Sequence, residues 1–394
     1  MNTDKYFVEI GVHQNAKNSQ HVAGDVFISH KTADRRIVCV LADGLGSGIK
    51  AHVLSTLTAT MAMRFVAEDI DMNKAASIIM STLPVCSERK IGYSTFTIVD
   101  IRPQGDVRIV EYDNPSYAVV RENGLADQQK QLVGIQTANL GSRTLRFSSF
   151  TADVGDRVVF FTDGVSQSGV GTQQYPLGWT EQEAAGYASR LVKATPRVSA
   201  RELARAMVGR ATANDSQKAK DDISCAVLYF RKPRKLLVVT GPPFDAQKDA
   251  TLATLVKKFD GNTIICGGTT AQIVARELGS AVKVDLSCID PKIPPMSVMK
   301  GVDLVTEGAI TLSRAAELLA QGCDPEGLRP NAAVKLLEQF INSDSIHFVV
   351  GTRINEAHQD PSLPAELDIR RNLIRRIAGT LKEKYMKETS IELI

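Results

Sequence analysis

Aspartates stand at the ends of apolar runs at three places in the chain. The segments 36–44 and 157–164 each end in Asp-Gly, and the segment 220–227 begins with paired acids ahead of an apolar run. A single Asp-Gly is usually only a turn, but carboxylates held at several strand ends can be aimed at one point. Mg²⁺ and Mn²⁺ take oxygen ligands and need no histidine or cysteine. The candidate metal ligands are Asp43, Asp163 and Asp221.

Short strand patterns and two helical periods surround these acids in the first half of the chain. The expected strands are 37–41, 93–101, 107–112, 118–121, 157–161 and 223–230. Asn123-Gly124 is a strong hairpin signal. Apolar residues recur at helical spacing over 54–65 and again after Ser199, where Glu202 completes a capping-box spacing. Strands in hairpins with a few long helices predict an α+β domain.

The best boundary between domains is the charged, proline-bearing segment 231–235. Beyond it, strand patterns at 236–239, 263–266, 282–286, 304–305 and 346–350 alternate with helical stretches. This alternation predicts an α/β domain with a mainly parallel, doubly wound sheet. We therefore expect domains at 1–231 and 236–394, and a terminal helix over 368–388.

Composition excludes several function classes. Hydrophobic residues make up 43% and charged residues 23% of the chain, and its formal net charge is only +3. Such values are typical of a globular protein, with no general field for nucleic acid or a membrane surface. No window approaches the ~18 apolar residues of a membrane span. Six scattered cysteines make zinc and a disulfide framework poor interpretations. We expect a cytoplasmic protein without nucleic-acid or membrane partners.

Four ordered motifs give a more specific indication. They are Ala23-Gly24-Asp25, the segment from Leu41 to Gly48, Phe161-Thr162-Asp163-Gly164-Val165 and Lys220-Asp221-Asp222-Ile223-Ser224. In order and approximate spacing they resemble the metal-dependent protein phosphatases of the 2C type, and most closely the bacterial stage II sporulation protein E branch. The resemblance covers roughly residues 8–231, and Asn114-Pro115-Ser116 is similar to that branch as well.

The resemblance implies a β-sandwich flanked by helices, with two divalent cations, Mn²⁺ or Mg²⁺, at one end. It implies that Asp43 bridges both ions, that the carbonyl of Gly44 and the side chain of Asp25 serve the first, and that Asp163 and Asp221 hold the second. Asp222 would have a supporting role. The implied reaction is hydrolysis of a phosphoserine or phosphothreonine in a regulatory protein, such as an anti-sigma factor antagonist, by attack of a metal-bridging hydroxide.

The sequence also departs from the relatives' pattern. Leu45 stands where eukaryotic relatives have a histidine after the first Asp-Gly, so no proton donor to the leaving group is apparent there. No arginine can be assigned to grip phosphate, because Arg35 and Arg36 fall in a probable strand or turn and Arg64 falls in a helix. His52 is better interpreted as a surface or satisfied histidine than as a catalytic one.

Glycine and hydroxyl residues follow several expected strands of the second domain. The Gly-Gly-Thr-Thr segment precedes an expected helix over 271–278, whose positive end suits an anion. Turns and N-caps explain the same residues equally well. No GxGxxG follows a strand and no P-loop motif occurs. The candidate ligand-binding residues are Gly267, Gly268, Thr269, Thr270, Glu307 and Arg353.

Two functional interpretations remain open from the sequence. The first is a phosphoprotein serine/threonine phosphatase with a regulatory, ligand-sensing C-terminal domain. The second is a catalytically weak signalling or binding module with a phosphatase fold, whose α/β domain binds a small anionic ligand. The four intact acidic motifs favour the enzyme, and a homodimer is compatible with either interpretation.

Overall fold

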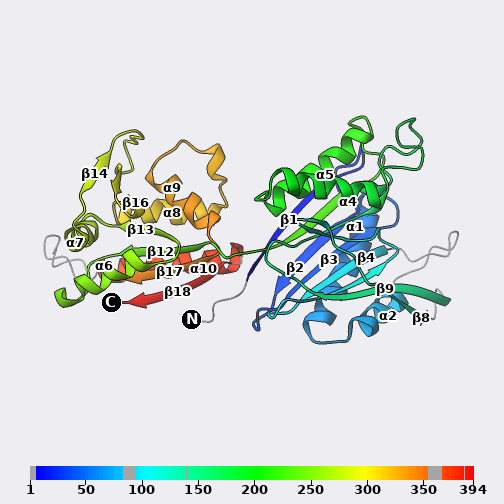
Figure 1. Cartoon of the computed structure of the whole chain (residues 1–394), viewed down its shortest axis with the longest axis horizontal. Helices are drawn as coiled ribbons and strands as arrows, with labels where there is room; N and C mark the ends of the chain where they lie inside the picture. Colours follow the sequence, from blue (N-terminus) through cyan, green and yellow to red (C-terminus); the bar gives the residue numbers. More distant parts are fainter. Residues whose placement is uncertain (1–5, 83–93, 138–140, 354–365, 386) are drawn as a thin grey trace. The chain divides into compact units, whose positions relative to one another are not determined.

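The structure is a computed structural model that describes residues 6–82, 94–137, 141–353, 366–385 and 387–394. The chain divides into two compact units, Met1–Lys232 and Pro233–Ile394 (Figure 1). Between them, the last strand of the first unit ends at Arg231 and the first strand of the second begins at Lys235. Each unit has its own sheets and its own core, and each is described by itself.

The first unit contains a six-stranded antiparallel sheet with the order β2-β3-β4-β5-β9-β8. Its strands are β2 (Val26–Lys31), β3 (Ile37–Gly44), β4 (Ser94–Ile101), β5 (Asp106–Tyr112), β8 (Gln131–Thr137) and β9 (Gly141–Thr151). Buried β-branched residues fill the centre of β3 and β4 on both faces, which is why these two strands lie inside the sheet rather than at its edge.

A five-stranded antiparallel sheet with the order β1-β11-β10-β6-β7 lies against the first. Its strands are β1 (Phe7–Asn15), β6 (Ala118–Arg121), β7 (Gly124–Leu125), β10 (Arg157–Phe161) and β11 (Ile223–Arg231). The hairpin predicted at Asn123-Gly124 is confirmed, because β6 and β7 pair across it. All five residues of β10 are buried, as expected for a strand covered on both faces.

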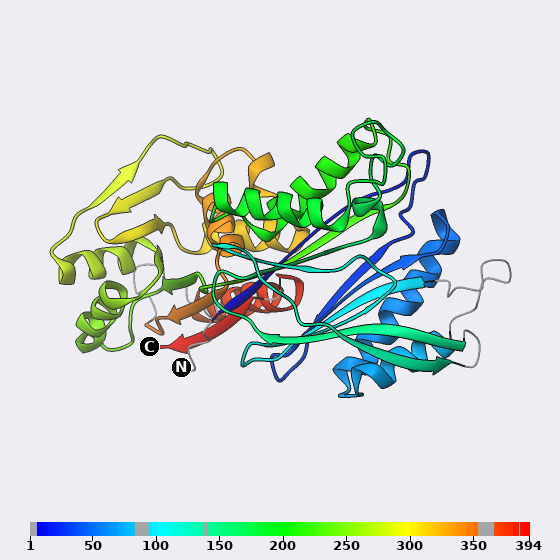
Figure 2. The same cartoon turned by 45° about the vertical axis from the view of Figure 1, so that its right-hand side comes forward.

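The two sheets form a sandwich with helices on both outer faces. Apolar side chains of β3, β4 and β5 meet those of β1, β10 and β11 in one shared core. The outer helices are α1 (Gly48–Ala67), α2 (Met72–Thr82), α3 (Asp163–Ser166), α4 (Glu181–Ala194) and α5 (Ala200–Asn214). Helices α1 and α2 cover the six-stranded sheet, and α4 and α5 cover the five-stranded one (Figure 2). The predicted capping box between Ser199 and Glu202 is present at the start of α5.

The second unit has one mixed seven-stranded sheet with the order β14-β15-β16-β13-β12-β17-β18. Its strands are β12 (Lys235–Thr240), β13 (Asn262–Cys266), β14 (Val282–Asp285), β15 (Met296–Met299), β16 (Val302–Thr306), β17 (Ser345–Val350) and β18 (Glu388–Leu393). Strands β16, β13, β12, β17 and β18 are parallel. The β14–β15 hairpin is antiparallel, so the sheet is mixed.

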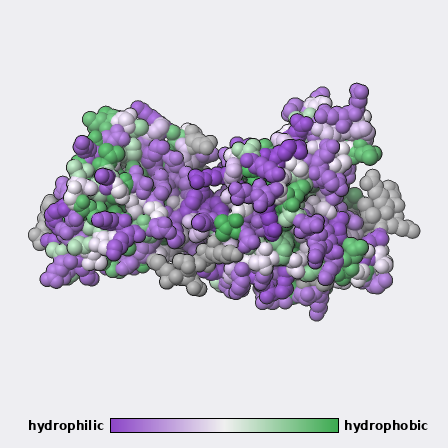
Figure 3. Space-filling model, viewed as in Figure 1, coloured by the Kyte–Doolittle hydropathy of each residue, from purple (hydrophilic) through white to green (hydrophobic). Residues whose placement is uncertain are grey.

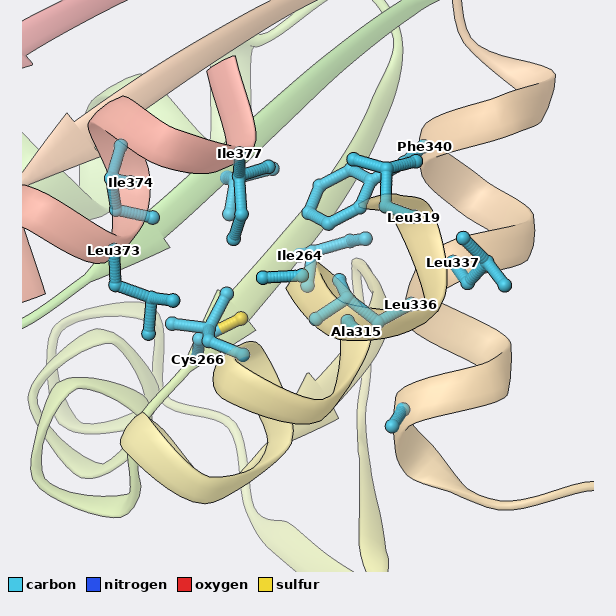
Figure 4. Close-up of a cluster of buried hydrophobic side chains, with 14 of the residues drawn as sticks. Ile264, Cys266, Ala315, Leu319, Leu336, Leu337, Phe340, Leu373, Ile374 and Ile377 are labelled. Atoms are coloured by element: carbon cyan, nitrogen blue, oxygen red, sulfur yellow. The ribbon is translucent and has the colours of Figure 1, made fainter. Parts of the chain in front are cut away.

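Helices cover both faces of this sheet. Helices α6 (Asp249–Lys258) and α7 (Gly268–Leu278) pack on one face. Helices α8 (Ala309–Gln321), α9 (Ala332–Asn342) and α10 (Glu366–Tyr385) pack on the other. Figure 4 shows this second core, where Ile264 and Cys266 of β13 lie among side chains of α8, α9 and α10.

The end of the chain differs from the predicted terminal helix over 368–388. Helix α10 stops at Tyr385, and β18 begins at Glu388 as a parallel strand on β17. The helical spacing of apolar residues does not reveal this stop, because the strand that follows is stabilised by pairing with a distant segment. Among the helices of the described residues, none combines the length and the apolar character needed to cross a bilayer.

Candidate functional site

Strand pairing in the five-stranded sheet brings two of the acidic motifs together. Because β10 and β11 are antiparallel, Phe161 at the end of β10 lies opposite Cys225 near the start of β11. The motif that follows β10 and the motif that precedes β11 therefore share one end of the sheet. Their backbones nearly touch, since a Cβ on Gly164 would lie 2.1 Å from the carbonyl oxygen of Asp222.

The other two motifs meet at one end of the six-stranded sheet. Val26, the first residue of β2, lies opposite Ala42 of β3, so Asp25 and Asp43 are neighbours across the pair. Gly44 ends β3 beneath the first turns of α1, where a Cβ would lie 2.2 Å from the carbonyl oxygen of Ala51. This Asp-Gly is therefore a packing requirement as well as a turn.

Asp25 connects the two sheets. One carboxylate oxygen accepts hydrogen bonds from the Thr162 hydroxyl at 2.8 Å and from the Ser224 hydroxyl at 2.6 Å. Both donors belong to the β10–β11 end of the other sheet. The second oxygen, Oδ1, is buried and has no hydrogen-bond partner among the described residues. A buried, unpartnered carboxylate oxygen is costly, and an oxygen of this kind is suited to bind a cation.

Burial raises the pKa of all four central carboxylates, and mutual repulsion adds to the rise at three of them. The pKa of Asp25 rises to about 7, chiefly through burial, although its two hydroxyl donors oppose the shift. Burial raises the pKa of Asp43 well above its usual range, and the charges of Asp25, Asp163 and Asp221 add to this. Burial also raises the pKa values of Asp163 and Asp221, and for Asp221 the charge of Asp163 contributes. Concentrated negative charge of this kind favours a cation.

The adjacent acids Asp221 and Asp222 have different partners. Both oxygens of Asp222 accept backbone hydrogen bonds, from the N–H of Lys17 at 2.9 Å and of Gly24 at 2.8 Å. Asp222 thus holds the segment that leads to Asp25. Asp221 is half-exposed and lies 4.0 Å from the Lys17 ammonium, so its carboxylate is the more accessible of the two.

The donor set fits a hard divalent cation. It offers several carboxylates, a buried orphaned oxygen and the Gly44 carbonyl at a strand end, and such oxygen donors suit Mg²⁺ or Mn²⁺. Among the residues that the structure describes, no three His, Cys, Asp or Glu side chains form a ready-made cage. Water and backbone carbonyls would therefore have to complete the coordination, as is usual for Mg²⁺.

Several residues around the cluster were not identified from the sequence. Thr162 and Ser224 hold Asp25, and the Gln14 amide donates to Ser224 at 3.1 Å and to the Asp25 carbonyl at 3.4 Å. The Gln167 amide donates to Asp163 at 3.0 Å. The only local signal is a hydroxyl residue directly beside an acidic motif, as in Thr162-Asp163. That signal is too common to be used alone.

Asn114, in the Asn-Pro-Ser segment, supports the strands beneath Asp43. Its side-chain oxygen accepts a hydrogen bond from Thr95 at 2.6 Å, and its amide donates to Thr97 at 3.1 Å. Thr95 lies directly opposite Asp43 in the β3–β4 pair. Asn114 is 2% exposed, so its role is to hold these strands and not to contact a substrate.

His52 and Arg36, two of the basic residues that the sequence places near the motifs, have structural partners. Nδ1 of His52 lies 2.9 Å from the carbonyl oxygen of Ala23. Arg36 is buried and makes ion pairs with Asp100 and Asp69. These contacts give both residues a structural role.

In the second unit, the loops after β13 and β16 lie side by side. The N–H of Gly267 donates to the carbonyl oxygen of Thr306 at 2.8 Å. The Glu307 carboxylate accepts from the N–H groups of Ile310 at 3.0 Å and Thr311 at 3.4 Å, so it caps α8. Within the described chain no side chain caps α7, whose N-cap is Gly267 at φ 126°.

These two loops lie at a topological switch point. The helix that follows β13 packs on one face of the sheet, and the helix that follows the neighbouring β16 packs on the other. A crevice at such a point is where open α/β sheets bind ligands. Arg353 follows β17, which β12 separates from β13, so the structure does not bring it together with Gly268 and Thr269.

Comparison with known proteins shows the family of this fold and site. A family model described as stage II sporulation protein E (SpoIIE) matches residues 33–231, about half of the chain. The chain belongs to this family. The curated protein of the same name from Bacillus subtilis (strain 168) is 23% identical over 193 residues, which are 47% of this chain and 22% of that protein. The match thus spans about a fifth of that relative's length.

Solved structures with similarity include phosphatase domains. The phosphatase domain of SpoIIE from Bacillus subtilis has a TM-score of 0.44 and 19% identity, over 58% of this chain and 94% of that one. The RsbU and RsbW domains of Rv1364c from Mycobacterium tuberculosis give a TM-score of 0.46 and 16% identity, over 65% and 68%. RsbX in complex with magnesium has a TM-score of 0.40 and 15% identity, over 57% of this chain and 96% of that one.

Proposed function

We propose that residues 1–231 form a metal-dependent phosphatase domain that hydrolyses phosphoserine or phosphothreonine in a regulatory protein. The observation that carries the proposal is the convergence of four acidic motifs, from two sheets, on one cluster with an orphaned Asp25 oxygen. Membership of the SpoIIE family supports it. By resemblance, the substrate is a phosphorylated regulatory protein such as an anti-sigma factor antagonist, and the reaction takes place in the cytoplasm.

Asp43, Asp163, Asp221 and the Gly44 carbonyl would hold two divalent ions, Mn²⁺ or Mg²⁺, with Asp25 beside them. When bound, such ions neutralise phosphoryl oxygens and lower the pKa of water. The chain supplies the positioning. Asp43 is fixed by the β3–β4 pairing, Asp25 by two hydroxyl donors, and Asp222 by two backbone donors. Leu45 offers no proton to a leaving alkoxide, so that proton would come from water.

Phosphate release from a phosphothreonine peptide, measured with Mn²⁺ and with Mg²⁺, tests this proposal. Asp43→Asn and Asp163→Asn remove ligand charge but little volume, and each should retain less than about a tenth of the rate, at least ~1.4 kcal/mol of barrier. Asp127→Asn is the matched control, because Asp127 is exposed and lies on the β7–β8 connection. Unchanged rates in both ligand variants, or an inert wild type with both metals, would reject the assignment.

For the C-terminal unit we propose a site for a small phosphate- or carboxylate-bearing molecule at the N-terminus of α7. Gly268 and Thr269 are exposed there, and the first N–H groups of a helix favour an anion. A second observation supports it: the Thr311 hydroxyl is buried without a hydrogen-bond partner among the described residues. Thr311 lies one turn before Ala315, which packs near Cys266, and helical side chains lean toward the N-terminus. In this proposal the hydroxyl points toward the end of β13.

Thermal melts of the full chain test this second site. Inorganic phosphate and a panel of phosphorylated and carboxylate metabolites are the probes, and a ligand at a hundred times its Kd should stabilise by ~2.7 kcal/mol. Any stabilisation should be lost in Thr269→Val and Thr311→Val but kept in Thr254→Val, an exposed threonine on α6. No shift by any probe, or a shift that all three variants keep, would return these loops to the role of turns and caps. This outcome is independent of phosphatase activity.

A further inference from the structure

Strand β14 is an open edge of the C-terminal sheet. It ends the strand order and, within the described residues, pairs only with β15. The outer edge of such a strand presents unpaired backbone N–H and C=O groups, which are a template for another strand. Apolar side chains on and just after this strand are also exposed: Val284 is 60% accessible, and Leu286, which directly follows the strand, is 65% accessible. Hydrophobic surface is visible in this region in Figure 3.

The sequence of this edge is complementary to itself. It reads Val282-Lys283-Val284-Asp285-Leu286. If two copies lie antiparallel with Val284 opposite Val284, Lys283 of each copy lies opposite Asp285 of the other, and Val282 opposite Leu286. Residues directly opposite each other in an antiparallel pair are in side-chain contact, and opposite charges there are stabilising.

We propose that two copies of this chain associate through β14, in antiparallel orientation about Val284, so that two seven-stranded sheets become continuous. The occupant of the edge is thus a second copy of this chain. The two-fold axis makes the interface isologous, so the Lys283–Asp285 and Val282–Leu286 pairs each occur twice and the Val284 pair occurs once, on the axis.

The charges select this register over its neighbours. A two-fold antiparallel pairing must place one residue opposite itself. Centring on Lys283 places two ammonium groups opposite each other, and centring on Asp285 places two carboxylates opposite each other. Only Val284 as the centre makes both charged pairs attractive while keeping the valines in contact. A lysine on an edge strand commonly prevents association, but here each lysine meets a carboxylate.

The two faces of the strand support the same arrangement. Val282 and Val284 point to the face of the sheet that α6 and α7 cover. On that face Val282 lies opposite Met299 and packs against the core. Pairing would extend that apolar row with Leu286, Val284 and Val282 of the second copy. Lys283 and Asp285 point to the opposite face. One oxygen of Asp285, Oδ1, accepts a hydrogen bond from the N–H of Ser287 at 2.9 Å, and the proposed pairing would use the other oxygen.

Sedimentation equilibrium of the full chain, up to about 100 μM where a micromolar Kd is saturated, tests the association. We expect a monomer–dimer equilibrium that Lys283→Asp and Asp285→Lys each weaken about tenfold or more, since each creates two repulsive pairs. The double variant Lys283→Asp/Asp285→Lys should restore the wild-type Kd to within about threefold. Neither side chain is buried, and thermal melts check that each variant is folded.

Oxidative cross-linking gives an independent readout of register. Val284→Cys should form a disulfide-linked dimer, because it lies opposite itself and such Cβ atoms are ~5 Å apart. Val298→Cys is the matched control, a similarly exposed valine (56%) on the inner strand β15. Wild-type protein gives the background from native cysteines.

Three results would overturn the proposal: a monomer throughout the concentration range, a dimer indifferent to both single charge variants, or equal cross-linking of Val284→Cys and Val298→Cys. Association only with another protein, blocked by Lys283→Asp, would assign the edge to a different partner and reject the self-association.

Discussion

In the N-terminal unit the strand ends carry carboxylates, whereas in the C-terminal unit they carry glycines and hydroxyls. Burial raises the pKa values of these carboxylates, and their mutual repulsion adds to the rise. In the C-terminal unit the acid of the crevice, Glu307, already caps α8. The divalent cations that we propose would balance the charge of the first arrangement, and the anion that we propose for the C-terminal unit would bind the uncapped helix end of the second. Negative charge at the strand ends thus favours a cation, and the positive end of a helix there favours an anion.

Two glycines of the N-terminal unit are tightly packed against backbone, whereas Gly268 of the C-terminal unit has open space around it. Alanine substitutions at these positions should give the largest differences in stability. A Cβ on Gly44 or Gly164 would lie within 2.2 Å of a backbone oxygen, and only backbone movement can relieve that. Gly44→Ala and Gly164→Ala should each destabilise the protein by about 3 kcal/mol or more.

Gly268→Ala is the control for that effect. No atom outside its immediate neighbours lies within 4 Å of the position that a Cβ on Gly268 would take, and alanine suits a first helical turn. The stability of this variant should change by less than about 0.5 kcal/mol. Chemical denaturation of the three variants measures the difference. Similar stabilities for all three would contradict the distinction between packing glycines and open glycines.

Metal and pH should act together on the acidic cluster of the N-terminal unit. The folded-state pKa of Asp25 is about 7, above its unfolded value, so folding takes up a proton between about pH 4 and pH 7. Without metal, stability should fall as the pH rises through that window, and the raised pKa values of Asp43, Asp163 and Asp221 should add to the fall. Mn²⁺ should restore it, most at the upper end, because metal binding requires deprotonated carboxylates.

Thermal melts at several pH values, with EDTA or with Mn²⁺, measure this effect. Asp25→Asn is the control and should lose the part of the pH dependence that Asp25 contributes, while Asp43, Asp163 and Asp221 keep theirs. A metal-free protein whose stability is flat between about pH 4 and pH 7 would contradict the raised pKa.

The sequence predicted the acidic cluster better than its supports. Local apolar patterns reveal the strands beside Asp43, Asp163 and Asp221. Strand pairing places Asp163 and Asp221 at one end of the five-stranded sheet, and packing of the two sheets brings them near Asp43 at the end of β3. Thr162 and Ser224 were missed because their partner, Asp25, is 137 and 199 residues away. Local pattern carries no information about such pairs. Strand β18 was missed for the same reason, since its pairing with β17 is long-range.

Asp221 and Asp222 provide a sharper comparison within one motif. Asp222→Asn should cost about 2 kcal/mol of stability, because its carboxylate accepts two buried backbone N–H bonds and an amide can replace only one acceptor. Asp221→Asn should leave stability nearly unchanged but weaken the Mn²⁺ dependence of phosphate release. Denaturation curves and metal titrations of both variants separate the effects. Equal loss of stability in both would contradict the division of roles.

The smallest effect concerns two buried threonines at the crevice of the C-terminal unit. Thr311 has a hydroxyl without a partner among the described residues, whereas the Thr306 hydroxyl donates to the Glu307 carbonyl oxygen at 2.8 Å. Valine has the shape of threonine but no hydroxyl. Because an unsatisfied buried hydroxyl costs free energy, Thr311→Val should stabilise the ligand-free protein by about 1 kcal/mol.

Thr306→Val should instead destabilise the protein by about 1 kcal/mol, because it removes the hydrogen bond to the Glu307 carbonyl oxygen. Paired thermal melts of the two variants measure the contrast. If Thr311→Val instead destabilises the protein as much as Thr306→Val does, its hydroxyl is satisfied in solution. Thr311 would then have no unsatisfied hydroxyl, and it could not be compared with the unpartnered Oδ1 of Asp25.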